Sequence, residues 1–290
     1  MKILVTGSNG QLGYDVLKEG KKSGLNIKGV GRKEFNIIDK SQVENYIFHM
    51  NPDIIIHCAA FTSVDEAEQH KKLCMDVNYL GTKNIAETAK KINAKLVYIS
   101  TDYVFNGEGN LPFDETTSPC PINYYGETKL DGENVIKALM NDWFIVRVSW
   151  VFGINGKNFV KSILKNAKIK HELNVVDDQI GSPTYTIDLA RFLLDLIDTD
   201  KYGIYHVTNS GYCSWADFAE EIVKLSSNNS KVNRISSDHY QTKANRPKNS
   251  RLSKKSIDRN GFTRLPEWED ALKRFLMELN KDKGDTKYGK

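Results

Sequence analysis

Tyr125 and Lys129, four residues apart, are the pair in this sequence whose types and spacing best suit chemistry. On a helix this spacing places both side chains on one face. An ammonium group beside a phenol favours the phenolate, so we expect Lys129 to lower the pKa of Tyr125 from about 10 toward the working pH. The pair predicts a tyrosine that passes a proton to a carbonyl oxygen as it becomes an alcohol. Lys129 could also bind the ribose hydroxyls of a nicotinamide cofactor.

The same spacing occurs twice more, at Tyr14/Lys18 and at Tyr79/Lys83. The first pair falls in the helix predicted at 11–22, and the second falls in a long helix predicted in the middle of the first half. We interpret both pairs as chance occurrences on solvated or packed helix faces. Only Tyr125 begins a helix that follows a proline-rich loop, which favours the catalytic role for Tyr125 over a structural one.

Hydroxyl groups end a strand shortly before that helix. Ser100 and Thr101 follow a run of apolar residues that begins at 96. In open α/β sheets, ligands bind outside the carboxyl ends of the strands. We therefore predict that Thr101 hydrogen-bonds the substrate oxygen beside Tyr125. The alternative is a threonine that merely ends its strand.

The N-terminus reads as a short apolar strand, 2–6, that leads directly into three glycines spaced by three, Gly7, Gly10 and Gly13. A strand, a glycine turn and a helix together form a pocket for the pyrophosphate of a dinucleotide, because the helix-start amides and the helix dipole face the anion. An ordinary glycine-rich turn is the alternative. The predicted cofactor-binding residues of this loop are Gly7, Asn9, Gly10, Gln11, Leu12 and Gly13.

A second segment expected at the cofactor follows the third strand. Its small side chains would let the backbone pass close to the cofactor, and its predicted contacts are Ala59, Ala60 and Thr62. His57, at the strand end, is predicted to be a buried histidine with satisfied hydrogen bonds rather than a catalyst. Asn78 is expected to support the Lys129 site and so to belong to the cofactor-binding set, with helix packing as the alternative.

Strand-like and helix-like segments alternate through the first half of the chain, which predicts an α/β fold with a Rossmann-type doubly wound parallel sheet. The expected strands are 2–6, 25–30, 53–57, 95–100 and 143–149, with helices near 11–22, 40–50, 64–91 and 124–140. After Trp150 this alternation loosens into a smaller C-terminal α/β lobe. There we expect helices near 157–169, 186–198, 214–226 and 267–280, and strands near 172–176, 203–207 and 232–236.

The sequence divides into two lobes on this reading. Residues 1–150, with about 178–205, are predicted to bind the dinucleotide, and residues 151–177 and 206–290 are predicted to bind a substrate. No flexible linker separates the lobes, so we expect them to share an interface. The lysine-containing tail from Lys281 to Lys290 is expected to be a frayed, solvated end.

The composition excludes several function classes. The 41 Lys and Arg residues exceed the 37 Asp and Glu residues by only four, which argues against nucleic-acid binding. No apolar run reaches the about 18–20 residues of a membrane span. Cys58, Cys74, Cys120 and Cys213 show no metal-binding spacing and fit a reducing compartment. The N-terminus is a strand rather than a signal peptide, so we expect a cytoplasmic protein.

Several of these motifs together resemble the extended short-chain dehydrogenase/reductase superfamily: the glycine loop, Tyr125-x-x-x-Lys129, and the segments Ser-Thr-Asp-Tyr-Val-Phe at 100–105 and Arg-Val-Ser-Trp-Val-Phe at 147–152. Two further segments, 177–184 and 245–252, are similar to those of the dTDP-4-dehydrorhamnose reductase family. The resemblance covers about the whole chain. Arg-Pro-x-x-Ser-x-Leu near the C-terminus is its most family-specific element.

The resemblance assigns roles by position. It implies that Thr101, Tyr125 and Lys129 form the catalytic triad and that Trp150 lies against the sugar ring. An arginine guanidinium also suits the diphosphate of the substrate. The residues implied to bind the nucleotide sugar are Thr101, Asp102, Val104, Phe105, Trp150, Asn158, Phe159, Gln179, Arg246 and Arg251.

The implied reaction is the NAD(P)H-dependent reduction of the C4 keto group of dTDP-4-dehydro-L-rhamnose to dTDP-L-rhamnose, in deoxysugar and polysaccharide biosynthesis. Related 4,6-dehydratases carry Asp-Glu after the catalytic threonine, whereas here Asp102 is followed by Tyr103. The alternatives are another nucleotide-sugar reductase, an epimerase that keeps its NAD bound, and a non-catalytic regulatory subunit similar to the methionine adenosyltransferase beta subunit. An intact Thr101, Tyr125 and Lys129 argues against the last of these.

Cofactor choice depends on the end of the second strand, where Arg32 stands and no acidic residue is present. Arg32 could hold a 2′-phosphate, which favours NADPH with NADH also accepted; a solvated surface arginine is the alternative. The family pattern implies that Asp39 contacts the adenine. The chain shows no ligand cluster, so we predict no catalytic metal. A homodimer is expected from the frequency of such assemblies alone.

Overall fold

Six strands form a central parallel sheet in the computed structural model, which describes residues 1–285. Their order is β10-β5-β4-β3-β1-β2, and every neighbouring pair is parallel. The strand order reverses beside β1, which is the point where open α/β sheets bind their ligands. The strands are β1 Lys2–Thr6, β2 Asn26–Val30, β3 Ile54–His57, β4 Lys95–Thr101, β5 Trp143–Val148 and β10 Gly203–His206.

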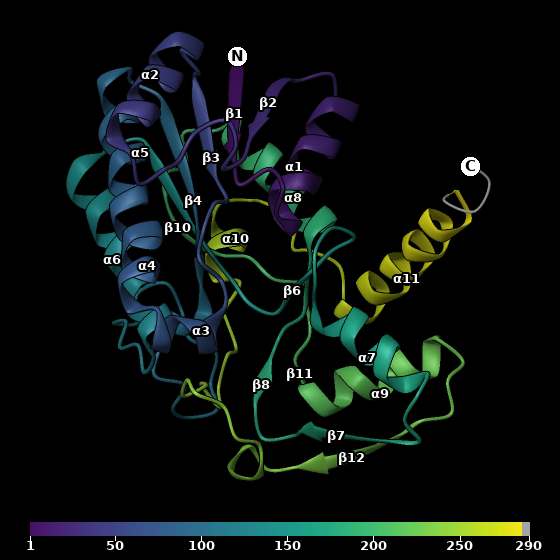
Figure 1. Ribbon diagram of the computed structural model, residues 1–290. Helices are drawn as coiled ribbons and strands as arrows, with labels where there is room; N and C mark the ends of the chain where they lie inside the picture. The colour runs from purple at the N-terminus through teal and green to yellow at the C-terminus, as the bar shows by residue number, and fades with distance from the viewer. Residues whose placement is uncertain (286–290) are drawn as a thin grey trace.

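Helices cover both faces of this sheet, so its strands are buried on both sides (Figure 1). In β1, Ile3 and Val5 pack into the core on one face, whereas Leu4 packs into the core on the other. This division follows from the alternation of side chains along a strand. One face carries α1 Gln11–Lys22, α8 Thr186–Ile197 and α10 Lys255–Arg259; the other carries α2 Lys40–Met50, α5 Thr82–Lys91 and α6 Tyr124–Leu139.

The long helix predicted at 64–91 is not continuous. It consists of α3 Val64–Gln69, α4 Lys71–Met75, a π-helical turn η1 Asp76–Gly81 and α5. The backbone leaves helical geometry at His70, where φ is −113° and ψ is 48°. The periodicity of the side chains hardly changes across such a break, so the sequence did not reveal it. π-helical turns frequently mark functional sites, and this one carries Asn78.

The second lobe lies beside the carboxyl edge of the sheet and has its own hydrophobic core, which includes Phe152, Phe218 and Phe275 (Figure 1). Its helices are α7 Phe159–Ala167, α9 Trp215–Leu225 and α11 Trp268–Asp285. Its strands pair in twos: β7 Glu172–Val176 with β12 Lys231–Ile235, β8 Ile180–Gly181 with β11 Cys213–Ser214, and β6 Val151–Phe152 with β9 Thr184–Tyr185.

Apart from the broken helix, the predicted elements are confirmed with ends that shift by at most two residues, except that α11 continues to Asp285. The strand predicted at 203–207 is the sixth strand of the central sheet. Two-residue strands and the single turns η2 Asp102–Val104 and η3 Ser237–His239 are too short to give a sequence pattern. Among residues 1–285, no helix is both long and apolar enough to cross a membrane. Residues 286–290 of the predicted tail lie outside the described part.

Candidate active site

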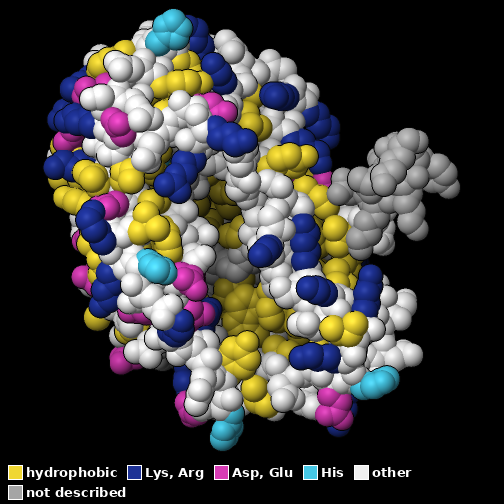
Figure 2. All heavy atoms as spheres, in the orientation of Figure 1, with side chains coloured by type: hydrophobic (Ala, Val, Ile, Leu, Met, Phe, Trp, Pro, Cys, Tyr) yellow, Lys and Arg dark blue, Asp and Glu magenta, His cyan; other side chains and the backbone are white. Residues whose placement is uncertain are grey.

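A cleft opens at the carboxyl edge of the sheet, between the two lobes (Figure 2). It consists of two cavities of about 480 and 550 Å³ that share Gly7, Gly10, Cys58 and Ala60 in their walls. We call them the outer cavity and the inner cavity. The outer cavity lies over the ends of β1 and β2, and the inner cavity extends past β4 to the second lobe. Together they offer one continuous site for a dinucleotide and a second ligand.

The glycine loop forms the wall where the two cavities meet. Gly7 has a φ of +66°, and a Cβ there would lie 2.6 Å from the backbone nitrogen of Ala59. A Cβ on Gly13 would overlap the carbonyl oxygen of Gly7. Helix α1 begins directly after Gly10, so its free amides face the cleft. The loop therefore forms a cradle in which added side chains would fill the space, and this cradle fits a pyrophosphate.

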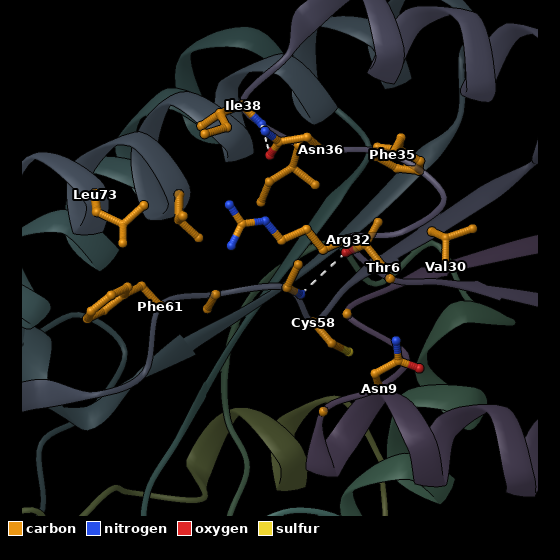
Figure 3. A pocket seen from close by; sticks show the side chains of 17 residues that line it. Thr6, Asn9, Val30, Arg32, Phe35, Asn36, Ile38, Cys58, Phe61 and Leu73 are labelled. Carbon is orange, nitrogen blue, oxygen red and sulfur yellow. Dashed lines mark hydrogen bonds between the residues drawn. The ribbon is translucent and has the colours of Figure 1, made fainter.

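The outer cavity is lined by apolar groups and by Arg32, whose side chain extends across it (Figure 3). Asn9, Ala59 and Ala60 line it as predicted. Asp39, which the family pattern places at the adenine, is not among the residues that line the outer cavity. Its carboxylate caps α2 instead, accepting hydrogen bonds from the Gln42 backbone nitrogen at 3.1 Å and from Gln42 Nε2 at 2.8 Å.

The predicted catalytic triad lines the inner cavity, which also contains Gln11, Leu12 and Thr62. Thr101 ends β4, and its hydroxyl donates to Asp102 Oδ1 at 3.0 Å. Tyr125 and Lys129 project from the first two turns of α6, whose start is capped by the side chain of Asn123. The structure thus brings Thr101, Tyr125 and Lys129 together at one wall.

The expected effect of Lys129 on Tyr125 is wrong. Burial raises the pKa of Tyr125 well above its usual value, and the Asp102 carboxylate adds to the rise. Burial also lowers the pKa of Lys129 to about 7, and the Lys129 ammonium lies 3.9 Å from the centre of the Tyr98 ring. The cost of desolvating both groups therefore outweighs the attraction between the Lys129 ammonium and the Tyr125 phenolate. A phenol that keeps its proton suits a proton donor.

Two buried polar residues, one at the end of β3 and one in η1, hold this wall in place. His57 is buried, with Nδ1 at 2.6 Å from Thr6 Oγ1 and Nε2 at 3.2 Å from Thr82 Oγ1, so the prediction of a satisfied histidine is confirmed. Asn78 donates to Thr128 Oγ1 of α6 at 3.0 Å and accepts from the Phe61 backbone nitrogen at 2.8 Å. Asn78 thereby fastens the segment after β3 to the helix that carries Lys129.

Trp150 enters the inner cavity from the loop after β5, with an unusual φ of +50° for a non-glycine residue. Its ring stacks on Trp215 at 3.6 Å between centroids. Gly181 lies against it too, because a Cβ there would be 2.8 Å from Trp150 Cε2. Strained residues of this kind cluster at functional sites. Sequence reasoning missed Trp215, although Ser214 and Asp217 around it form a capping box at the start of α9.

Because Gly181 touches the indole, we expect Gly181→Ala to displace the Trp150 ring and raise the KM for the substrate by about tenfold, about 1.4 kcal/mol. Tryptophan fluorescence and steady-state kinetics measure the two effects. Gly20→Ala is a matched control, because its Cβ would also lie 2.8 Å from a neighbour, but there the neighbour is the flexible end of Ile27 in another part of the fold. An unchanged KM and spectrum in Gly181→Ala would contradict this account of Trp150.

Arg246 reaches the inner cavity from the C-terminal segment. Its guanidinium donates to Asp65 Oδ2 at 2.6 Å and to the Tyr103 hydroxyl at 3.4 Å, while its Nε is buried without a hydrogen-bond partner in the protein. A buried donor without a partner is costly. Arg246 thus lies at the cavity wall with a donor group that is free of protein partners, and its predicted role in binding an anionic ligand stays a prediction.

Val104 and Phe105 do not line the cavity. Both are buried in a small hydrophobic cluster with Leu252, and Phe105 stacks on Phe113 at 4.4 Å. They hold the loop after β4 against the C-terminal segment, so their effect on a ligand is indirect.

Four other predicted substrate residues are not among those that line the inner cavity. Asn158 donates to Gln11 Oε1 at 2.9 Å and thereby ties α7 to the glycine loop. Phe159 packs on Trp215, with 4.5 Å between the ring centroids. Gln179 is buried, and Arg251 donates to Asn249 Oδ1 at 3.0 Å. Asn158 and Phe159 thereby support two residues of the wall, Gln11 and Trp215.

No group of three or more His, Cys, Asp and Glu side chains within residues 1–285 could hold a metal ion. The absence of a catalytic metal stays a prediction. The donors that face the cleft are hydroxyls, amides and cations, which suit a phosphorylated organic ligand.

Known proteins are similar to this chain over nearly its whole length. A family model described as the RmlD substrate binding domain matches residues 1–281. The spore coat polysaccharide biosynthesis protein SpsK of Bacillus subtilis is 42% identical, with 96% of this chain and 97% of that protein covered. The dTDP-4-dehydrorhamnose reductase of Sinorhizobium fredii is 37% identical, with 96% and 98% covered. A crystal structure of the Bacillus anthracis dTDP-4-dehydrorhamnose reductase in complex with NADP has a TM-score of 0.93 and 43% identity, covering 96% of this chain and 100% of that one.

Proposed function

Because the chain belongs to the RmlD family of dTDP-4-dehydrorhamnose reductases, we propose that it reduces the C4 keto group of dTDP-4-dehydro-L-rhamnose to dTDP-L-rhamnose with NADPH. One observation carries the proposal: Thr101, Tyr125 and Lys129 face the cavity that continues directly from the glycine cradle. A carbonyl in the inner cavity can therefore meet a proton donor on one side and a nicotinamide on the other.

The residues have distinct roles in this reaction. Bound NADPH supplies the hydride that adds to C4. The Thr101 hydroxyl, which donates to Asp102 Oδ1 in the unliganded site, would turn to donate to the carbonyl oxygen and orient it, and Tyr125 donates its phenolic proton to that oxygen. The ammonium form of Lys129 donates hydrogen bonds to the ribose hydroxyls and so holds the nicotinamide beside the carbonyl.

The diphosphate of the substrate is assigned to Arg246. Its guanidinium faces the inner cavity while Asp65 and Tyr103 fix its orientation. Tyr103 stands where a dehydratase would carry its extra glutamate, and its hydroxyl lies against Arg246. The absence of that glutamate at position 103 favours reduction over elimination. Trp150 and Trp215 form the aromatic wall beside the sugar.

The test is to mix the purified protein with dTDP-4-dehydrorhamnose and to follow NADPH and NADH oxidation in parallel. We expect stoichiometric loss of reduced cofactor with dTDP-rhamnose as product. An epimerase would consume no cofactor, and a regulatory subunit would leave both sugar and cofactor unchanged. Either outcome would overturn the proposal.

Arg32 is proposed to bind the 2′-phosphate of NADPH, because its side chain crosses the outer cavity (Figure 3). Replacing Arg32 with Ala should weaken NADPH binding by at least about tenfold, about 1.4 kcal/mol, because a charge-assisted hydrogen bond is lost. NADH binding should change little. Lys33→Ala, at the exposed neighbouring position, is the matched control. Fluorescence titration with both cofactors measures the difference, and an equal loss for NADH would argue against this role.

We further propose that residues 1–150, with about 178–205, hold the dinucleotide, and that 151–177 and 206–290 hold the nucleotide sugar. Attachment of α8 and β10 to the sheet supports the assignment of 178–205 to the dinucleotide side, whereas α10, within 206–290, also packs on the sheet. A cytoplasmic location and a homodimer are also proposed, the first from the biosynthetic reaction and the second from the frequency of such assemblies.

A further inference from the structure

A buried ion pair lies directly beneath the proposed active site. Glu133 of α6 and Arg147 of β5 are 0% and 1% exposed. Arg147 donates through Nε to Glu133 Oε1 at 2.9 Å and through Nη2 to Glu133 Oε2 at 2.7 Å. This bidentate geometry is the strongest form of the interaction.

Two further contacts connect the pair to the strands of the site. Ser100, the residue before Thr101, donates its hydroxyl to Glu133 Oε1 at 2.6 Å. His206 of β10 lies with Nε2 at 3.3 Å from Arg147 Nη1, and its Nδ1 lies 3.2 Å from the Phe113 carbonyl oxygen. Burial and the Arg147 charge hold the pKa of His206 well below its usual value. His206 is therefore neutral. The buried cation of this network is Arg147, and the partly exposed Lys137 of α6 lies 4.0 Å from Glu133 Oε2.

The spacing along α6 connects the pair to catalysis. Tyr125, Lys129 and Glu133 are each four residues apart, so they follow one another along a single helix face. That face packs on β4, the strand that ends in Thr101. A shift of α6 along β4 would separate Thr101 from Tyr125.

Stability alone gives no reason for this ion pair, since hydrophobic residues of similar volume often replace a buried pair without loss. We propose that Glu133 is a positioning residue of the reduction: held by Arg147 and Ser100, its carboxylate fixes α6 against β4 one helical turn from Lys129, where its charge acts on the ammonium group. This inference rests on the proposed function.

The second role of Glu133, its effect on the charge of Lys129, follows from the groups that surround the ammonium. Burial lowers the pKa of Lys129 to about 7, and the Glu133 carboxylate opposes the fall more than the thiols of Cys58 and Cys74 do. The Tyr98 ring lies under the ammonium, and the buried His57, with a pKa of about 3, is neutral. Loss of the Glu133 charge should therefore lower the pKa of Lys129 further, so that Lys129 deprotonates at a lower pH.

The experiment compares Glu133→Gln and the double variant Glu133→Gln/Arg147→Met with the parent enzyme. The double variant leaves no orphaned charge, so it should keep the fold that the single change endangers. We expect kcat of both variants to fall by about tenfold or more. The alkaline limb of their profile of kcat against pH should move to lower pH by about one unit. The pH at which NADPH binding weakens should move in the same direction, because Lys129 holds the ribose.

Asp188→Asn/Arg274→Met is the matched control. Arg274 binds both oxygens of Asp188 at 2.7 Å, in another bidentate pair that lies outside the cleft. This control variant should have a lower thermal midpoint but the parental pH profiles of kcat and of NADPH binding. If the double variant does not fold, Glu133→Asp, which withdraws the carboxylate by one methylene, should shift both profiles in the same direction by less.

A folded Glu133 variant with the parental kcat and pH profiles would overturn the inference, and so would a control that shifts equally. If instead the parent enzyme does not reduce the sugar nucleotide, the proposed function fails, and the pH dependence of NADPH binding still decides the relation between Glu133 and Lys129.

Discussion

Tyr125→Phe should lower kcat with dTDP-4-dehydrorhamnose by about 10²–10⁴-fold, which is the range that a general acid contributes. The substitution keeps the ring, whose centroid lies 5.9 Å from that of Tyr103, and removes only the hydroxyl. The burial that raises the pKa of Tyr125 keeps its proton in place for transfer, and phenylalanine has no proton to give. NADPH binding should therefore stay close to that of the parent, measured by fluorescence titration beside steady-state kinetics.

Tyr14→Phe is the control for this substitution, because Tyr14 has the same spacing to a lysine but is 42% exposed on α1. Its Lys18 bonds to Glu278 and not to the cleft. We expect parental kcat in this control. Normal turnover in Tyr125→Phe would remove the proton donor from the mechanism.

Gly7→Ala should have the second large effect, on NADPH binding. The new Cβ would lie 2.6 Å from the Ala59 nitrogen and 2.7 Å from its Cα, so the backbone of the cradle must move. The φ of +66° adds a cost of about 1–2 kcal/mol for a residue with a side chain. We expect the Kd for NADPH to rise at least about tenfold and the thermal midpoint to fall.

Gly24→Ala separates the two causes. Gly24 has a similar φ of +73°, but a Cβ there meets nothing within 4 Å. It should therefore lower the thermal midpoint through backbone strain and leave NADPH binding unchanged. If both variants bind NADPH as the parent does, the cradle is not the pyrophosphate site.

Local patterns were enough to predict the frame of the site. The strand before Gly7 and the helix after Gly10 are encoded by adjacent residues, and Thr101, Tyr125 and Lys129 lie at element ends that sequence patterns mark well. Parallel topology then brings these ends to one edge of the sheet. Trp150 and Arg246 were found only through the family motifs, because each reaches the cleft from a loop without regular periodicity.

Properties that depend on packing could not be predicted in the same way. The pKa of Tyr125 follows from how deeply the folded chain buries the phenol, which the Tyr–Lys spacing does not reveal. Asp39 stands at the position that the family pattern implies, but the start of α2 takes its carboxylate as a cap. Trp215 lies far along the chain from Trp150, and only the folded lobe brings the two rings together.

The most direct test of the central claim is isotopic. NADPH carrying deuterium on C4 of the nicotinamide, in the transferable position, is mixed with the protein and dTDP-4-dehydrorhamnose, and the product is read by mass spectrometry and NMR. We predict one deuterium at C4 of dTDP-rhamnose for each NADPH oxidised. Unlabelled or epimerised sugar with the cofactor still reduced would contradict the assignment of this cleft to reduction.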